Sequence, residues 1–181
     1  KILRVKASNI FVKGRGQGEL ESEPEPHDSL IPMESLEIPM SPSQHVAGSQ
    51  LFIRPADLFF SQDSISSKFR NRSSIRDTLD QLLKKEIRKR DVEMMRIVIC
   101  DDRPFSLSNR RLALYRLLQM AGTCKRVKVE IVNKTAQSQS KFTTQCHGEK
   151  VFIRDTSEVV GRGLEDTQFD HPAIRAGRLN G

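Results

Sequence analysis

Charged residues are segregated into blocks along this chain, and this segregation limits where a folded core can form. Residues 1–18 carry five basic residues and no acid, whereas residues 19–49 carry seven acids, five prolines and neither lysine nor arginine. An acidic, proline-rich segment of this kind does not build a core alone. Residues 50–135 hold 19 basic and 10 acidic residues, and residues 136–181 hold six of each. We predict a basic arm, an acidic proline-rich extended segment, a folded domain and an extended C-terminal strap over these four ranges.

The spacing of apolar residues predicts two main helices in the folded domain. Over residues 73–90, five apolar residues share one helical face: Ile75, Leu79, Leu82, Leu83 and Ile87. Ser74 and Asp77 match a capping box at the start of this helix. The second helix is expected to begin after Ser108 and to end before Gly122, because glycine commonly follows the last helical residue.

Short strands are expected around these helices. Residues 50–60 form a short strand that Pro55 stops, and residues 95–100 form a strand of the buried type, followed by a turn and a short return strand. Residues 126–132 alternate apolar and charged side chains. The order strand, helix, strand, strand, helix, strand predicts a compact α+β domain with a small mixed sheet. In the strap, residues 150–155 are a further candidate strand, and the glycines after them favour extended chain.

Two arginines stand at the start of the second helix, in the stretch FSLSNRRLALYRLL (residues 105–118). Arg110 and Arg111 fall in the first turn, where the helix dipole is positive and the free amides prefer an anion. Either both guanidinium groups point into water, where screening makes the penalty small, or they converge with the backbone amides on one phosphate group. We adopt the phosphate as the working hypothesis.

This helix start, together with the IRP of the first strand and the order of elements, resembles the ParB/sulfiredoxin-like superfamily over residues 50–134. ParB-type members carry a Gly-Glu-Arg-Arg-like box there that binds nucleotide phosphates, and Ser108, Asn109, Arg110 and Arg111 occupy its place here. The missing acid argues against nucleotide hydrolysis. In sulfiredoxins the nucleophilic cysteine stands where Asn109 stands here, and only Arg111 matches the phosphate-binding arginine. Because an amide forms no thiolate, the resemblance implies a degenerate fold without sulfiredoxin activity.

No catalytic residue, metal site or cofactor is predicted. Cys146 and His147 are adjacent rather than spaced as zinc ligands, and the pair Asp101 and Asp102 is typical of a turn. Three cysteines at wide spacings argue against a disulfide framework and favour a reducing compartment. No apolar run is long enough to span a bilayer, so we expect no membrane partner.

The net charge of +7 favours a polyanionic partner. The residues predicted to contact phosphate or RNA are Ser108, Asn109, Arg110, Arg111, Lys84, Lys85, Arg88, Lys89, Lys13 and Arg15. The basic residues between positions 84 and 89 also complement the dipole of the first helix, which explains them equally well without RNA. We predict a non-catalytic structural subunit of a large ribonucleoprotein, a mitochondrial ribosome or its assembly intermediate, that contacts rRNA phosphates and neighbouring proteins.

Two other functions remain open at this point. A ParB-like nucleotide-binding switch or nuclease would use the two arginines of the second helix, and a protein-only scaffold would use its positive charge only for solubility. The chain begins at Lys1, which fits a cleaved organellar presequence and a mitochondrial matrix protein. The cytosol and the nucleus are the alternative compartments.

Overall fold

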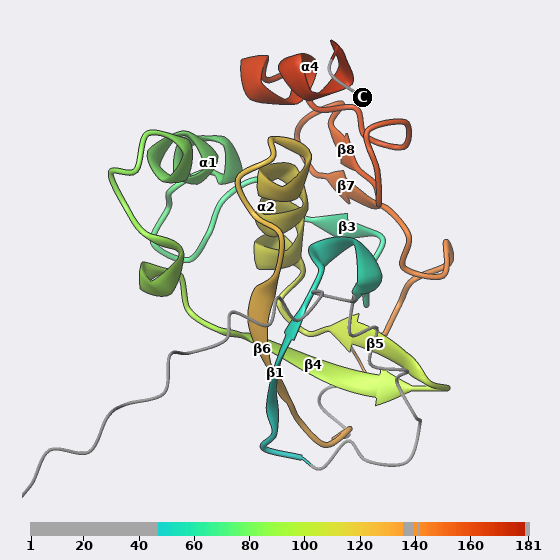
Figure 1. Cartoon of the computed structure of the whole chain (residues 1–181). Helices are drawn as coiled ribbons and strands as arrows, with labels where there is room; N and C mark the ends of the chain where they lie inside the picture. Colours follow the sequence, from blue (N-terminus) through green and yellow to red (C-terminus); the bar gives the residue numbers. More distant parts are fainter. Residues whose placement is uncertain (1–46, 136–139, 141, 180–181) are drawn as a thin grey trace, which may run out of the picture. The chain divides into compact units, whose positions relative to one another are not determined.

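Three α-helices and two mixed β-sheets make up the part of the chain that the computed structural model describes, residues 47–135, 140 and 142–179 (Figure 1). The elements in chain order are β1 (Gln50–Ile53), the 3-10 helix η1 (Pro55–Asp57), β2 (Phe59–Phe60), β3 (Ser64–Ile65), α1 (Ile75–Leu83), the 3-10 helix η2 (Lys89–Asp91), β4 (Met95–Cys100), β5 (Arg103–Ser106), α2 (Asn109–Met120), β6 (Val127–Ile131), β7 (Val151–Ile153), β8 (Val159–Val160) and α4 (Pro172–Leu179). This content confirms the predicted α+β class.

The larger sheet has the strand order β1-β6-β4-β5-β2. β6 is antiparallel to β1 and parallel to β4, while β5 is antiparallel to β4 and parallel to β2, so the sheet is mixed as predicted. The single strand expected over residues 50–60 is two strands, because Pro55 starts η1 between them. Val129 pairs with both Leu51 and Met95, which brings the alternating apolar residues of three strands onto one face.

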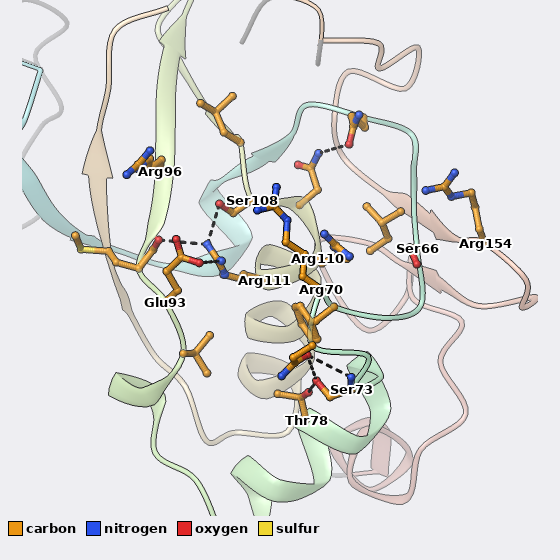
Figure 2. A pocket seen from close by; sticks show the side chains of 18 of the residues that line it. Ser66, Arg70, Ser73, Thr78, Glu93, Arg96, Ser108, Arg110, Arg111 and Arg154 are labelled. Atoms are coloured by element: carbon orange, nitrogen blue, oxygen red, sulfur yellow. Dashed lines mark hydrogen bonds and ion pairs between the residues drawn. The ribbon is translucent and has the colours of Figure 1, made fainter. Parts of the chain in front are cut away.

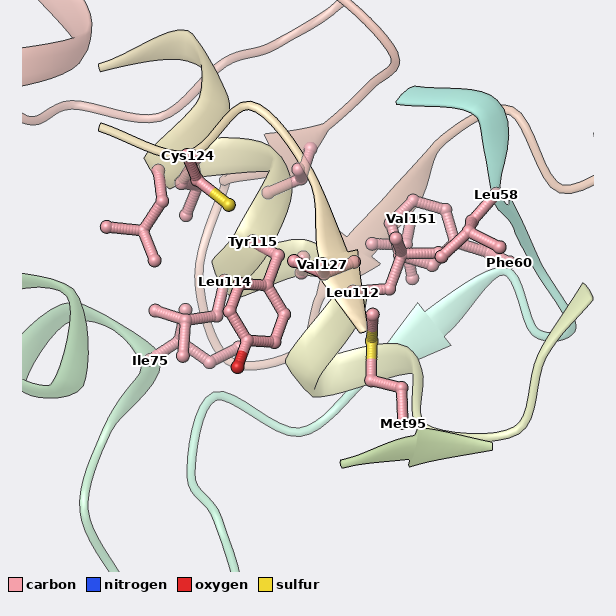
Figure 3. Close-up of a cluster of buried hydrophobic side chains, with 14 of the residues drawn as sticks. Leu58, Phe60, Ile75, Met95, Leu112, Leu114, Tyr115, Cys124, Val127 and Val151 are labelled. Carbon is pink, nitrogen blue, oxygen red and sulfur yellow. The ribbon is translucent and has the colours of Figure 1, made fainter. Parts of the chain in front are cut away.

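Helix α2 is buried along its whole middle, and the core forms around it. Every residue from Leu112 to Leu118 is buried, including the charged Arg116. The helix contacts α1, η1, β8 and α4, and Leu112 and Tyr115 lie among Val127 of β6 and Met95 of β4 (Figure 3). A helix that is covered on all sides has no solvent face, so its sequence shows no simple amphipathic pattern.

The first helix ends seven residues earlier than its apolar spacing predicted, at Leu83. Its capping box forms as expected, because Ser74 Oγ accepts from Asp77 N at 2.9 Å and Asp77 Oδ2 accepts from Ser74 N at 3.2 Å. At the other end Lys85 adopts a left-handed conformation (φ 62°), and Glu86 N donates to Gln81 O at 2.9 Å. This is the Schellman pattern that terminates helices.

The C-terminal segment is not the extended strap that its glycines suggested. The strand expected over residues 150–155 is confirmed as β7, and it joins β3 and β8 in a second sheet of order β3-β7-β8. Helix α4 follows, and its Ile174 is fully buried, as are Val151 and Val160. The apolar pairs that enter the core here are too short to show a period, so tertiary packing and not local spacing orders them.

Arg116 of α2 is fully buried and holds two separate segments to the helix, the η1 turn and the segment just before β7 of the second sheet. Its guanidinium group donates to Leu58 O and Glu149 O, both at 2.6 Å, and to Pro55 O at 3.4 Å. It also lies 4.4 Å from the ring centroid of Phe60. Burial, more than any nearby charge, lowers the pKa of Arg116 to about 9, so the side chain is still a cation at neutral pH.

Candidate functional site

A cleft of about 1190 Å³ lies at the N-terminal end of α2 (Figure 2). Its walls come from the loops on both sides of β3, the segment between η2 and β4, the start of α2 and the residue after β7. The charged residues among its lining are Arg70, Arg96, Arg110, Arg111, Arg154, Asp63, Asp91 and Glu93. Five guanidinium groups against three carboxylates, in a cleft that serines and an asparagine also line, favour an anionic ligand.

Arg111 makes an ion pair rather than pointing into water. Its guanidinium group pairs with the carboxylate of Glu93 and also donates to Ser108 Oγ at 3.3 Å and Met94 O at 3.5 Å. The Arg111 side chain is 23% exposed. The anion that the helix start needs therefore comes in part from Glu93, a residue of the preceding strand segment that no local pattern connects to α2.

Arg110 is exposed to the cleft and has no carboxylate partner among the described residues. Its guanidinium group donates to Lys68 O and lies 5.9 Å from the ring centroid of Phe69. Burial, and then the charges of Arg70, Arg111 and Arg154, lower the pKa of Arg110 from its ordinary value. Besides burial, the shift therefore includes the repulsion of the neighbouring arginines in this part of the cleft.

Ser108 and Asn109 have structural roles in the same turn. Ser108 is the N-cap residue, but its side chain makes no capping hydrogen bond and instead accepts from Arg111. Asn109 is buried, and its Oδ1 accepts from Ser61 N at 3.1 Å while its Nδ2 donates to Ser61 Oγ at 3.0 Å and Gln62 Oε1 at 3.2 Å. The amide of Asn109 thus joins α2 to the loop after β2.

Three arginines of the cleft were missed by the sequence analysis. Arg96 of β4 pairs with Glu130 of β6 at 3.5 Å. Arg70 and Arg154 are exposed, and neither guanidinium group forms a salt bridge with a described residue. Nothing in the local sequence distinguishes Arg70 from Arg72, and Arg154 lies in the segment that was expected to be an extended strap. Only the tertiary fold brings them beside Arg110.

The second predicted basic group lies apart from this cleft. Lys84, Lys85, Arg88 and Lys89 are exposed residues that follow the end of α1, and none of them lines the cleft. Lys89 Nζ donates to Thr123 O at 2.9 Å, so it links this segment to the end of α2. Lys13 and Arg15 lie outside the described residues.

The acids of the cleft are engaged by the protein itself. Asp63 accepts from Thr144 Oγ1 and Gln145 N, each at 2.8 Å, and from Cys146 Sγ at 3.1 Å. Burial alone would raise the pKa of Asp63, but the hydrogen bonds outweigh it and lower that pKa below its ordinary value. Asp91 accepts from the backbone of its own turn at 2.8 Å. Carboxylates held in this way are poor general bases.

Among the residues that the structure describes, no group of three or more His, Cys, Asp or Glu side chains is placed to hold a metal ion. No helix in the same part of the chain is long and apolar enough to cross a bilayer. Comparison of the chain with protein-family models, curated proteins and solved structures finds no match. The resemblance to the ParB/sulfiredoxin-like superfamily therefore stays a prediction from the motif and the order of elements.

Proposed function

We propose that the protein is a non-catalytic subunit of a large ribonucleoprotein and that its arginine cleft holds RNA phosphates. One observation carries this proposal: Arg70, Arg110 and Arg154 line one cleft and none of them has a carboxylate partner among the described residues. Guanidinium groups bind phosphate oxygens through paired hydrogen bonds. A mitochondrial ribosome or its assembly intermediate is the assembly we propose, on the basis of the charge pattern and the reducing compartment.

Each carboxylate among the described residues that line the cleft already has a partner within the protein, which supports a binding role over a catalytic one. Phosphate chemistry in a ParB-like or nuclease site needs a group that activates water or holds a metal ion. Here Glu93 pairs with Arg111, and Asp63 and Asp91 accept hydrogen bonds from the protein. The amide of Asn109 is likewise used inside the fold.

The exposed basic residues after α1 provide a second surface for the same partner. Lys84, Lys85 and Arg88 are exposed to solvent, and their charge is not taken up by salt bridges with described residues. Contacts of this kind follow the phosphate backbone and depend on salt more than on base sequence.

The test compares two double variants of the full chain that remove the same charge. Arg70→Ala with Arg154→Ala removes two cleft arginines, and Arg126→Ala with Lys128→Ala removes two exposed basic residues that lie outside both the cleft and the segment after α1. For a single-stranded RNA, the slope of log affinity against log salt should fall by about 1.4 in the cleft variant, because each phosphate contact contributes about 0.7. The control variant should keep the slope of the wild type.

Sedimentation of the native protein tests the assembly itself. The protein should comigrate with large particles, and treatment with RNase should release it.

A salt slope that is the same in the cleft variant and the wild type would contradict the assignment of the cleft. Comigration that resists both RNase and high salt would contradict RNA binding and favour a protein-only scaffold.

A nucleotide-binding function is the second candidate, and the size of the cleft favours it. Pockets for small ligands commonly have volumes of about 300–1,000 Å³, and this cleft is of that order. A ligand that binds only the folded state raises its melting temperature. A clear rise in melting temperature with CTP or ATP, in a preparation that does not bind RNA, would favour the nucleotide function.

A further inference from the structure

On one side of the cleft the arginines are paired with carboxylates (the compensated side), and on the other they have no carboxylate partner among the described residues (the uncompensated side). On the first, Arg111 pairs with Glu93, and Arg96 pairs with Glu130. On the second lie Arg70, Arg110 and Arg154, which come from the loop before α1, the first turn of α2 and the end of β7. In Figure 2, Arg70 and Arg110 lie together near the middle of the cleft, with Arg111 and Glu93 to one side and Arg154 to the other.

The uncompensated arginines repel one another, and the fold keeps them together in spite of this. Burial is the largest cause of the lowered pKa of Arg110, and the charge of Arg70 is the next. The charges of Arg111 and Arg154 lower that pKa further. Like charges at one place disfavour the folded state unless an anion enters. A group of cations without carboxylate partners is therefore arranged for a ligand and not for stability.

Two backbone hydrogen bonds and one hydrogen bond from the guanidinium group of Arg110 hold this arrangement. Arg154 N donates to Ile65 O at 2.8 Å, which ties the end of β7 to the end of β3. Ile75 N donates to Ser67 O at 2.9 Å, which closes the loop that carries Arg70. The bond from Arg110 to Lys68 O attaches the same loop to α2. A site whose supports are already joined loses less entropy when its ligand binds.

We propose that Arg70, Arg110 and Arg154 form a subsite for a phosphomonoester dianion, the terminal phosphate of an RNA strand or of a nucleotide. This inference rests on the proposed function of the cleft and makes its ligand specific. A phosphomonoester carries about 1.5 to 2 negative charges and three acceptor oxygens, whereas an internal phosphodiester carries one charge and two free oxygens. Three guanidinium groups from three segments of the chain supply the charge that a dianion needs, whereas a row of single basic residues along a strand would suit internal phosphodiesters.

The position of the other basic residues supports binding of the terminal phosphate of a strand rather than of a row of internal phosphates. Lys84, Lys85, Arg88 and Lys89 do not line the cleft, and the two remaining arginines of the cleft are paired with acids. The free positive charge of the cleft is thus concentrated at one place. Internal phosphates would meet the exposed basic residues after α1, while the terminal phosphate would enter the subsite.

Direct binding measurements on the full chain test the subsite. Fluorescence anisotropy would compare single-stranded RNAs of one sequence, about 12 nucleotides long, that end in a 5′-hydroxyl, a 5′-phosphate, a 3′-phosphate or a 5′-methylphosphate. The methyl ester has nearly the size of the phosphate but only one charge, so it separates charge from contact area. We expect one phosphate end to bind at least tenfold more tightly than the hydroxyl end, and the methyl ester to lose most of that gain, because the second charge of the dianion adds a close charge pair in a partly buried site.

Variants connect this gain to the three arginines. Arg70→Ala with Arg154→Ala should bind the phosphate end no more tightly than the hydroxyl end, while Arg126→Ala with Lys128→Ala should keep the gain. Arg154→Lys keeps a charge and should keep part of the gain, which guards against loss of folding as the cause. Inorganic pyrophosphate should compete with the phosphate end and should not displace the hydroxyl end.

The outcomes separate this inference from the proposed function. If all four RNAs bind equally and the cleft variant weakens them equally, the cleft binds internal phosphates and the subsite is refuted. If no RNA binds but pyrophosphate, ATP or CTP raises the melting temperature of the wild type and not that of the cleft variant, the ribonucleoprotein function is refuted and the subsite takes its dianion from a nucleotide. If neither RNA nor pyrophosphate binds, both proposals are wrong.

Discussion

The buried arginine of α2 allows the most direct test of how this fold is held together. Replacement of Arg116 by methionine keeps a long apolar stem of similar reach but removes every donor that the guanidinium group offers to Pro55, Leu58 and Glu149. The two bonds of 2.6 Å join a charged donor to a carbonyl, and a net contribution of about 1.5–3 kcal/mol is usual for each bond of that kind. The third bond is long and adds little.

The expected loss follows from these bonds and from the burial that opposes them. Two charge-assisted bonds give roughly 3–6 kcal/mol. Burial disfavours the cation, as its pKa of about 9 indicates, so we expect the lower end, about 3 kcal/mol. The free energy of unfolding of an ordinary domain is about 5–15 kcal/mol, so the variant should still fold. At a urea m-value typical of small proteins, the loss should lower the urea midpoint of Arg116→Met by about 1–2 M.

The site of the damage is predicted as well as its size. Because Glu149 O lies just before β7, hydrogen exchange in the described part of the C-terminal segment should rise more than exchange in β4 and β6. Arg126→Met is the matched control: this arginine is exposed, and its loss should change the free energy of unfolding by less than about 0.5 kcal/mol. If Arg116→Met is as stable as the wild type, carbonyl binding does not exceed the cost of burying the cation, and the argument is wrong.

Three further predictions concern single residues. Tyr115 is the only tyrosine in a chain without tryptophan, and burial raises its pKa to about 12. Absorbance should therefore show no tyrosinate in the native protein near pH 10, where the tyrosine of the unfolded chain ionises. Since the unfolded state then releases its proton first, the contribution of Tyr115 to the free energy of unfolding should fall as pH rises above about 10; a native titration near 10 would contradict this. Gly148→Ala should destabilise the protein by about 3 kcal/mol or more, because the φ of Gly148 is +75° and a Cβ there would lie 2.3 Å from Phe60 O. Gly122→Ala is the control: its φ is +73° but the space around it is open, so it should cost about 1 kcal/mol. Equal losses of stability in urea unfolding would rule out the clash. Asn109→Ala should cost about 2 kcal/mol because it leaves buried polar groups of the neighbouring loop unpaired, and an unchanged urea midpoint would exclude the structural role.

Local signals in the sequence predicted most of the elements of residues 50–135. Ser74 and Asp77 are three residues apart, and this spacing alone is enough for a capping box, which forms. Gly122 takes the left-handed conformation that its place after a helix predicted. By contrast, Lys85 takes the same conformation without any local signal, although this conformation is disfavoured for a lysine. The packing of the segment that follows, in which Ile87 is partly buried against the core, compensates for the cost.

The charge on the helix start was visible in the sequence, and what that charge does was not. Arg110 and Arg111 are adjacent and share one turn, yet one pairs with Glu93 and the other joins Arg70 and Arg154 in an uncompensated group. Partners that lie 18 to 44 positions away along the chain are chosen by the sheet order and the loop paths, which no local pattern encodes.

Spacing within a few residues decides hydrogen bonds that close within a turn, so the sequence by itself determined caps, turns, strand alternation and the basic character of the domain. The burial of all of Leu112–Leu118, the three carbonyls around Arg116 and the convergence of three arginines on one cleft were decided only by the tertiary structure. Each of these depends on which distant segment covers a side chain and therefore on the free energy of the whole packed core rather than on the preference of any single segment.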